Sequence, residues 1–199
     1  MTCCARLTTI ILFYIFMTGC SAIISESSEN NRLYDKTVNM NEQILHLKVK
    51  DYEDGGNMPY KFATKAGGGE NISPRISWQT LPEAKSYAIM FYDKFPAANN
   101  WVHWLIADIP NTFTDIPEGA SRTDKMPAGS RELITSWGRT GYDGPQPPVG
   151  SGNHEYVVTL YALDVNKLSV PENISRGDFL KTAEPHIIAQ ESYSGFFER

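Results

Sequence analysis

Apolar residues gather in four short runs along the chain. Each run is rich in β-branched and aromatic residues and is bounded by Gly, Pro or Asn, a pattern typical of strands. The runs cover residues 44–49, 86–92, 101–109 and 156–163. The sequence therefore predicts a body that consists mainly of β-strands, with no repeat and no second domain.

One helix is predicted near the C-terminus. Ser175, followed three residues later by Asp178, is typical of a helix start with side-chain capping. A rough helical stripe follows at Phe179, Leu180, Ala183 and Ile187. Because proline lacks the backbone N–H and its ring clashes with the preceding turn, Pro185 is expected to interrupt or kink this helix.

The first 20 residues predict an export signal. They hold one basic residue, Arg6, and an apolar run of eleven residues, 7–17. That run is shorter than the roughly 20 residues that span a bilayer. The ending Met17-Thr18-Gly19-Cys20 resembles a bacterial lipobox, with Met where Leu is usual. We expect Cys20 to be the lipidated mature N-terminus, and the alternative is a plain secretory signal that is cut elsewhere.

Residues 21–42 are rich in Ser, Glu and Asn and lack hydrophobic periodicity, which predicts a flexible tether. A random coil of about 20 residues reaches on the order of 25 Å. Residues 43–199 are then the folded domain. The expected location is the bacterial envelope, with the protein anchored by lipid, or otherwise periplasmic or secreted.

Composition narrows the classes of function. The 199 residues are 41% hydrophobic, which is enough for one core. Cys3, Cys4 and Cys20 all lie in the leader, so the mature domain has neither a disulfide nor a thiol. The net charge of −5 and the isoelectric point near 5.4 argue against nucleic acid as a partner, because binding to phosphate backbones needs a basic face.

Polar side chains that can do chemistry stand where strand faces end. Because side chains alternate across a strand, residues i and i+2 share a face. The expected faces are Ile89, Phe91, Asp93; Trp101, His103, Leu105; and His154, Tyr156, Val158, Leu160. Asp93, His103, His154 and Tyr156 are thus predicted to converge at one rim of the core.

Further residues at regular spacings give the chain a family resemblance. They are Asn71-Ile72-Ser73-Pro74, Trp78, Pro82, Asp93, His103-Trp104, Ile109-Pro110, Pro117-Glu118-Gly119, Gly144-Pro145, Pro147-Pro148, Gly150, His154 and Tyr156. Over residues 44–199 the chain resembles the phosphatidylethanolamine-binding proteins, in particular their bacterial Raf-kinase-inhibitor-like branch. The resemblance implies a β-sandwich with a few short peripheral helices and a pocket for anionic groups such as phosphate and phospholipid head groups.

The resemblance also implies which residues line the pocket. They are Asp93, Trp101, His103, Gln146, Pro148, His154 and Tyr156. Gln146 stands where the family has Gly or, in bacteria, often Cys. After Asp93 the family continues with a second aspartate, whereas this chain has Lys94-Phe95-Pro96. Lys94 would favour an anion only if its side chain points inward.

In such a pocket an anion would accept hydrogen bonds from imidazole N–H groups, from the Tyr156 hydroxyl and from backbone N–H groups of residues 144–152. Asp93 would hydrogen-bond one imidazole and fix its tautomer. We therefore expect a non-enzymatic binding protein for a small anionic or phosphorylated ligand, with neither a cofactor nor a metal. The natural ligand and the oligomeric state stay open.

Three other functions remain alternatives. The protein would act on a protein partner through a surface loop, as family members in eukaryotes regulate kinases. Two histidines and one carboxylate can form a facial triad for non-haem iron, although the tight His-x-Asp/Glu spacing is absent. A serine hydrolase has little support, because no G-x-S-x-G motif occurs and no serine is visibly paired with a histidine in the sequence.

Overall fold

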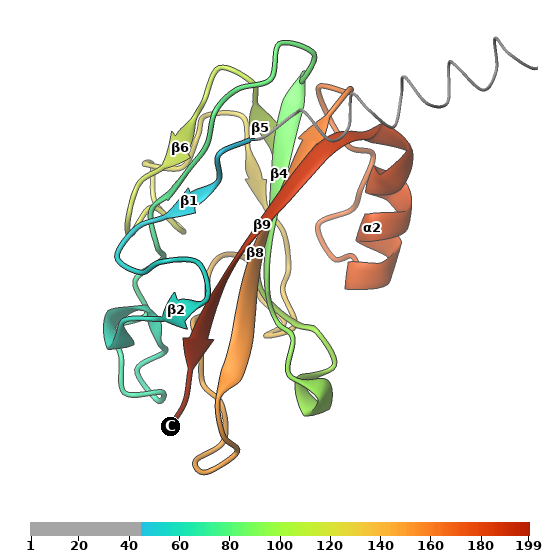
Figure 1. Cartoon of the computed structure of the whole chain (residues 1–199). Coiled ribbons are helices and arrows are strands. Elements are labelled where there is room, and N and C mark those ends of the chain that lie inside the picture. Colours follow the sequence, from blue (N-terminus) through green and yellow to red (C-terminus); the bar gives the residue numbers. More distant parts are fainter. Residues whose placement is uncertain (1–44) are drawn as a thin grey trace, which may run out of the picture. The chain divides into compact units, whose positions relative to one another are not determined.

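The computed structural model describes residues 45–199 (Figure 1). The predicted leader with Cys20 and the predicted tether lie outside these residues. The strands within them are β1 (Lys48–Val49), β2 (Gly56–Asn57), β3 (Ile76–Ser77), β4 (Ser86–Asp93), β5 (Trp101–Pro110), β6 (Asp115–Ile116), β7 (Arg131–Glu132), β8 (His154–Leu163) and β9 (Ile187–Phe197). The helical elements are η1 (Tyr60–Phe62), η2 (Pro96–Ala98), α2 (Arg176–Ala183) and η3 (Glu184–His186).

The strands form two sheets. The larger has six strands in the order β2-β9-β8-β4-β5-β7, and the smaller has three in the order β1-β3-β6. All pairings are antiparallel except that of β2 with β9. Strands β4, β5 and β8 are buried along nearly their whole length, which agrees with the three long runs of the sequence. The predicted 44–49 strand is reduced to the two residues of β1.

Each face of the large sheet is covered by apolar residues. On one face, Ile89, Phe91 and Val158 pack with Val49 and Ile116 of the small sheet. On the other face, a second cluster joins Met90, Leu105 and Tyr161 to Phe179 and Ala183 of α2. Figure 1 shows the small sheet and α2 on opposite sides of the central strands. The predicted β-sandwich with short peripheral helices is confirmed.

The helix near the C-terminus begins and ends for the expected reasons. The Ser175 hydroxyl accepts a hydrogen bond from the Asp178 backbone N–H at 3.1 Å, which caps α2. After Ala183 the chain tightens into η3, where Pro185 stands, and then enters β9. Among residues 45–199, no helix is both long and apolar enough to cross a membrane.

One predicted strand face is wrong. Phe91 pairs with Trp104 and the next residue, Tyr92, pairs with Val102, so His103 is an extra residue in β5. This bulge turns His103 and Trp104, which are consecutive, toward the same core, whereas Leu105 faces the cluster with α2. Strict alternation of side chains along the strand predicts that Leu105 and His103 share a face. This prediction fails because the one inserted residue turns the side chains that follow it to the opposite face.

Glycine fixes the approach of the loop that precedes β8. A Cβ on Gly144 would lie 1.8 Å from the carbonyl oxygen of Phe62, so only glycine fits where these two backbones meet. The Tyr142 hydroxyl donates to the same carbonyl at 2.8 Å. These contacts hold residues 144–148 against η1 and set the path of the chain into β8.

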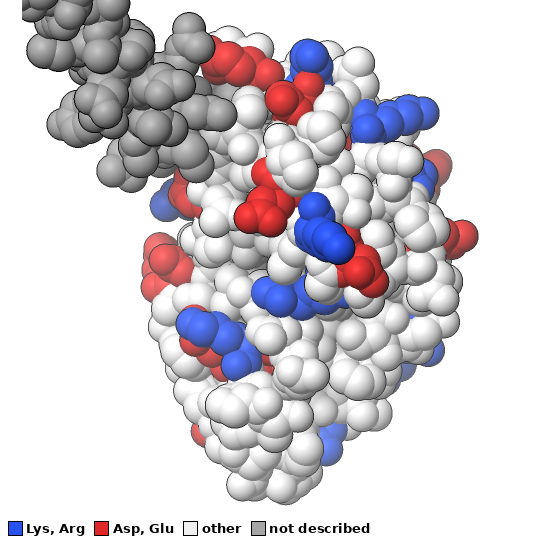
Figure 2. Space-filling model, turned by 90° about the vertical axis from the view of Figure 1, so that its right-hand side faces the viewer, with Lys and Arg blue, Asp and Glu red and all other residues white. Residues whose placement is uncertain are grey.

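Charged side chains are scattered over the face shown in Figure 2, and its lowest end carries none. In Figure 1 the loop that enters β8 lies at this end. The strands are joined here by residues 95–101 and 147–153. Neither range contains Asp, Glu, Lys or Arg, although these four residue types make up 21% of the chain. These two loops are thus formed by small, apolar and amide side chains.

We predict that Asp108→Ala lowers the free energy of unfolding by on the order of 2 to 4 kcal/mol. The buried Asp108 carboxylate accepts from Arg131 Nε at 2.7 Å and from the Leu168 N–H at 2.8 Å, and its loss strands both donors. Urea denaturation measures the change. The matched control is Asp115→Ala, whose ion pair with Arg75 is largely exposed and contributes about 0 to 1 kcal/mol. Equal losses in the two variants would contradict the prediction.

Candidate functional site

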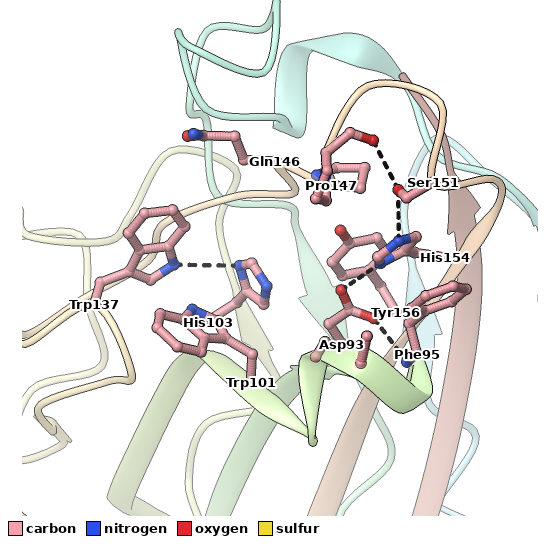
Figure 3. A pocket seen from close by; sticks show the side chains of 13 residues that line it. Asp93, Phe95, Trp101, His103, Trp137, Gln146, Pro147, Ser151, His154 and Tyr156 are labelled. Carbon is pink, nitrogen blue, oxygen red and sulfur yellow. Dashed lines mark hydrogen bonds and ion pairs between the residues drawn. The ribbon is translucent and has the colours of Figure 1, made fainter.

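A cavity of about 290 Å³ opens at the end of the central strands. It is bounded by the end of β4, the turn with η2, the start of β5, the loop that leads into β8 and the first residues of β8. The lining residues are Asp93, Phe95, Ala97, Ala98, Trp101, His103, Trp137, Gln146, Pro147, Pro148, Ser151, His154 and Tyr156 (Figure 3). All seven residues that the sequence assigned to the site line this one cavity.

His103 is held by a backbone carbonyl. Its Nδ1 lies 2.7 Å from the carbonyl oxygen of Asp143, and because a carbonyl can only accept, Nδ1 carries the proton. Nε1 of Trp137 lies 3.5 Å from the same Nδ1, a longer contact between two donors that is not a hydrogen bond in this tautomer. The indole N–H is therefore aimed at the His103 ring but meets no acceptor there (Figure 3).

This tautomer reverses the role that the sequence assigned to His103. With the proton on Nδ1, the neutral ring presents a lone pair at Nε2, so it accepts a hydrogen bond and donates none to the cavity. Burial lowers the pKa of His103 below its ordinary value of 6.5, and the bond to the Asp143 carbonyl and the nearby Asp93 charge offset only part of this effect. In a complex, His103 therefore acts as a hydrogen-bond acceptor. Its Nε2 becomes a donor only if the ligand transfers a proton to it.

The Asp143 carbonyl is itself fixed by the side chain of that residue. The buried carboxylate accepts from Arg139 at 2.6 and 2.8 Å and from Arg122 at 2.8 Å. Burial opposes ionisation of Asp143, but the two guanidinium groups outweigh it and hold the pKa of its carboxyl below the ordinary value. Although neither arginine lines the cavity, the pair holds the segment that orients His103.

His154 lies in the middle of a chain of short contacts. Its Nδ1 is 2.7 Å from Oδ2 of Asp93, and its Nε2 is 3.0 Å from Oγ of Ser151 (Figure 3). The Ser151 hydroxyl is also 2.7 Å from the Pro148 carbonyl. The Phe95 ring stacks on the imidazole, with centroids 3.8 Å apart and planes 11° from parallel. As the sequence predicted, Asp93 hydrogen-bonds one of the two imidazoles.

Two hydrogen-bond patterns fit these distances. In the first, Ser151 donates to Pro148 and accepts from Nε2–H of a His154 that is protonated on both nitrogens. In the second, His154 is neutral and Ser151 donates to Nε2. In both patterns His154 Nδ1–H donates to Asp93, whose other oxygen accepts from the Phe95 backbone N–H at 2.8 Å.

The Tyr156 hydroxyl has no partner. The residue is fully buried, and its oxygen has no hydrogen bond within residues 45–199. Burial raises the pKa of Tyr156 far above its ordinary value, and the neighbouring Asp93 charge adds to this effect, so the phenol keeps its proton. The Asp93 carboxylate and the Gln146 backbone lie near this hydroxyl, but neither forms a hydrogen bond of good geometry with it, so a ligand oxygen can engage this donor.

The remaining predicted residues shape the mouth of the cavity. Trp101 is 41% exposed and meets Trp137 edge-to-face at 5.8 Å, so the two rings form an aromatic wall. The side-chain carbonyl of Gln146 accepts a hydrogen bond from the Thr64 hydroxyl at 2.6 Å. The amide N–H₂ group of Gln146 takes no part in this bond. Lys94 does not line the cavity; it is exposed and pairs with Glu155 at 3.0 Å. Lys94, whose direction the sequence did not determine, therefore brings no positive charge into the cavity.

Sequence reasoning missed Phe95, Trp137 and Ser151. Phe95 and Ser151 lie in loops, where no periodicity shows which way a side chain points. One signal for Ser151 was available, because it stands three residues before His154 in a turn bounded by Gly150 and Gly152. Within residues 45–199, no group of three His, Cys, Asp or Glu side chains is arranged to hold a metal ion.

Comparisons with known proteins agree on one family. Residues 48–198 match the family model described as phosphatidylethanolamine-binding protein. A UPF0098 protein of Methanothermobacter thermautotrophicus is 35% identical over 156 residues, which cover 78% of this chain and 99% of the relative. LppC of Mycobacterium tuberculosis, named as a candidate lipoprotein, is 35% identical over 115 residues, or 57% of this chain and 53% of that protein.

The fold is similar to that of solved structures. The crystal structure of Escherichia coli YbcL, described as a new member of the mammalian PEBP family, aligns with a TM-score of 0.72. That alignment has 26% sequence identity and covers 79% of this chain and 99% of YbcL.

We predict that His103 makes the domain less stable in mild acid. Because the folded-state pKa lies below the ordinary 6.5, the unfolded chain takes up the proton first as the pH falls. The stability that the neutral His103 ring contributes is therefore fully present above pH 6.5, and it is lost as the pH falls below that value. Urea midpoints at several pH values for the native chain and His103→Gln measure it: the variant should lose less stability on acidification. His186→Gln, on the surface, is the control, and parallel pH profiles for all three proteins would refute the prediction.

Proposed function

This chain belongs to the phosphatidylethanolamine-binding protein family, and from that premise we propose that it binds a small anionic or phosphorylated group in the cavity around His103, His154 and Tyr156. The ligand class comprises phosphate and phosphorylated head groups such as phosphoethanolamine. Binding by neutral donors, with apolar walls around the remainder of the ligand, is the physical basis of this function.

The observation that carries the proposal is the unpaired hydroxyl of Tyr156. A buried O–H without an acceptor costs on the order of 1 to 3 kcal/mol, a cost that the fold recovers when a ligand oxygen accepts the hydrogen bond. The Trp137 ring lines the same cavity, with its indole N–H aimed at His103. An unsatisfied donor in a small recess favours a ligand that brings an oxygen acceptor.

The charges around the cavity define which anions suit it. Among the described residues, no Lys or Arg lines it, and Asp93 is engaged with His154. A ligand with two full negative charges would thus lose its hydration without meeting a free cation. A singly charged phosphate that retains a P–OH fits better, because that proton can be donated to Nε2 of His103 while its other oxygens accept from Tyr156.

We predict that Tyr156→Phe weakens phosphate binding by about 10- to 100-fold, as expected for one lost hydrogen bond to an anion. The variant should be as stable as the native chain or slightly more stable, because it removes an unsatisfied buried atom. Isothermal titration at pH 6 with phosphate, phosphoethanolamine and glycerol phosphate measures the affinity, and urea denaturation measures the stability.

The matched control is Tyr60→Phe, since Tyr60 is 59% exposed and outside the cavity. It should bind phosphate as the native chain does. The proposal fails if none of the three anions gives heat with the native chain, or if Tyr60→Phe and Tyr156→Phe behave alike.

We further propose that the domain works at a membrane, held by lipid on Cys20. The support is the lipobox-like ending Met17-Thr18-Gly19-Cys20 and the name of the relative LppC. A tether of about 20 residues between Cys20 and the domain would let the cavity reach head groups near the bilayer.

We predict that Cys20→Ala releases the protein from the membrane fraction. In a bacterial host, the native chain should incorporate labelled palmitate and partition into detergent, whereas the variant should do neither. Cys4→Ala is the control, since that residue would be removed with the leader. Mass spectrometry that finds an unmodified N-terminus beyond residue 20 would contradict lipidation.

A further inference from the structure

Ser151, His154 and Asp93 form a relay that the binding function does not require. Oγ of Ser151 lies 3.0 Å from Nε2 of His154, and Nδ1 of His154 lies 2.7 Å from Oδ2 of Asp93 (Figure 3). A hydroxyl, an imidazole and a carboxylate linked in this order are the parts with which unrelated hydrolases activate a serine. All three residues line the cavity.

We propose that Ser151 is a nucleophile activated by His154 and Asp93, and that the cavity transfers acyl groups from small uncharged carboxylic esters to this serine and then to water. This activity goes beyond the proposed binding function, because it depends on the reactivity of Ser151 and not on the affinity for anions.

The hydroxyl proton of Ser151 can reach the base without movement of the backbone. Its two acceptors, the Pro148 carbonyl oxygen at 2.7 Å and His154 Nε2 at 3.0 Å, lie around the same Oγ. Rotation about the Cβ–Oγ bond moves the proton from one acceptor to the other. When His154 is neutral with its proton on Nδ1, Nε2 is free to receive the proton from Ser151.

The base is held in place from two sides. Asp93, of which 4% is exposed, accepts a hydrogen bond from Nδ1–H of His154. It thereby selects the tautomer in which Nε2, the nitrogen beside Ser151, carries no proton. Its other oxygen is fixed by the backbone N–H of Phe95 at 2.8 Å. The Phe95 ring stacks on the imidazole and prevents it from tilting. Asp93 and Phe95 are therefore positioning residues, and Ser151 and His154 are the groups that react.

The turn around Ser151 leaves room for a substrate. Gly150 and Gly152 have φ values of 77° and 88°, in the left-handed region that favours glycine. A Cβ added to either would find no atom within 4 Å. The serine is thus presented on a tight turn with open space on both sides, and it is only half-buried.

The reaction balances without any further reagent. Oγ of Ser151 forms a bond to the ester carbonyl carbon while its proton passes to Nε2 of His154. The bond from that carbon to the alkoxy oxygen then breaks, and the proton passes to the leaving alcohol. Water attacks the acyl-serine in the same way, which releases the acid and restores Ser151. The Tyr156 hydroxyl, which has no acceptor, is a donor for the oxyanion in both steps.

The walls of the cavity define the substrate class. Phe95, Trp101, Pro147 and Pro148 offer apolar contact, and no cation among the described lining residues attracts a charged acyl chain. The volume of about 290 Å³ admits a short acyl group with a small alcohol and is too small for a long-chain lipid. Acetyl and butyryl esters are the probes of choice.

The test is covalent labelling of the full-length chain by a fluorophosphonate, together with hydrolysis of p-nitrophenyl acetate and butyrate. Peptide mass spectrometry should place the label on Ser151, and Ser151→Ala should lose both the label and the hydrolysis. Ser169→Ala, which removes an exposed serine outside the cavity, should keep both. Asp93→Asn should slow acylation on the order of 10²- to 10⁴-fold while KM stays within about twofold.

Three results would overturn the relay: an unlabelled Ser151 in a chain whose circular dichroism shows it folded, a label on another residue, or equal labelling in Asp93→Asn. Each would leave Ser151 as a structural link between the loop and β8. The titration of phosphate stands apart from this outcome. Heat from phosphate without a label refutes only the relay, and a label without heat refutes only the anion-binding function.

Discussion

The antiparallel register of β4 with β8 is the constraint on which the site depends. The pairing runs without a break from Ser86 opposite Leu163 to Asp93 opposite Tyr156. Because Asp93 ends β4 beside Tyr156, its carboxylate lies next to His154, two residues earlier on the same face of β8. A slip of one residue would turn His154 and Tyr156 to the α2 face and dissolve the cavity. The buried apolar faces of both strands prevent that slip.

The two histidines of the cavity differ because their partners differ. His103 donates to a carbonyl that is anchored through Asp143 and two arginines, and its Nε2 has no partner within residues 45–199. His154 is engaged on both nitrogens, by Asp93 and by Ser151. His103 is therefore the imidazole that a ligand can contact directly. His154 instead orders the loop and, in the proposed relay, moves a proton.

Sequence reasoning succeeded where side-chain direction has a simple period. The faces of β4 and β8 followed from alternation, since both strands pair with each other without a bulge. It failed on β5, because nothing local marks the extra residue at His103 that turns Leu105 to the other face. Family resemblance brought in Gln146 and Pro148, which lie in a loop and have no period. Lys94 had no such guide, and its direction is set by Glu155, which is distant in sequence.

The absence of charge at the mouth of the cavity connects the two proposals. The loops 95–101 and 147–153 carry no charged residue, so they offer a ligand short-range hydrogen bonds and shape rather than charge. In such surroundings the field of the Asp93 carboxylate is little screened, which strengthens its hold on His154. The same low polarity that makes the unpaired Tyr156 hydroxyl costly also makes it an effective donor, whether to the oxygen of a bound phosphate or to the oxyanion of an ester. A phosphate held there and a tetrahedral acyl intermediate on Ser151 would place negative oxygens in the same recess, so phosphate should compete with ester substrates if both proposals hold.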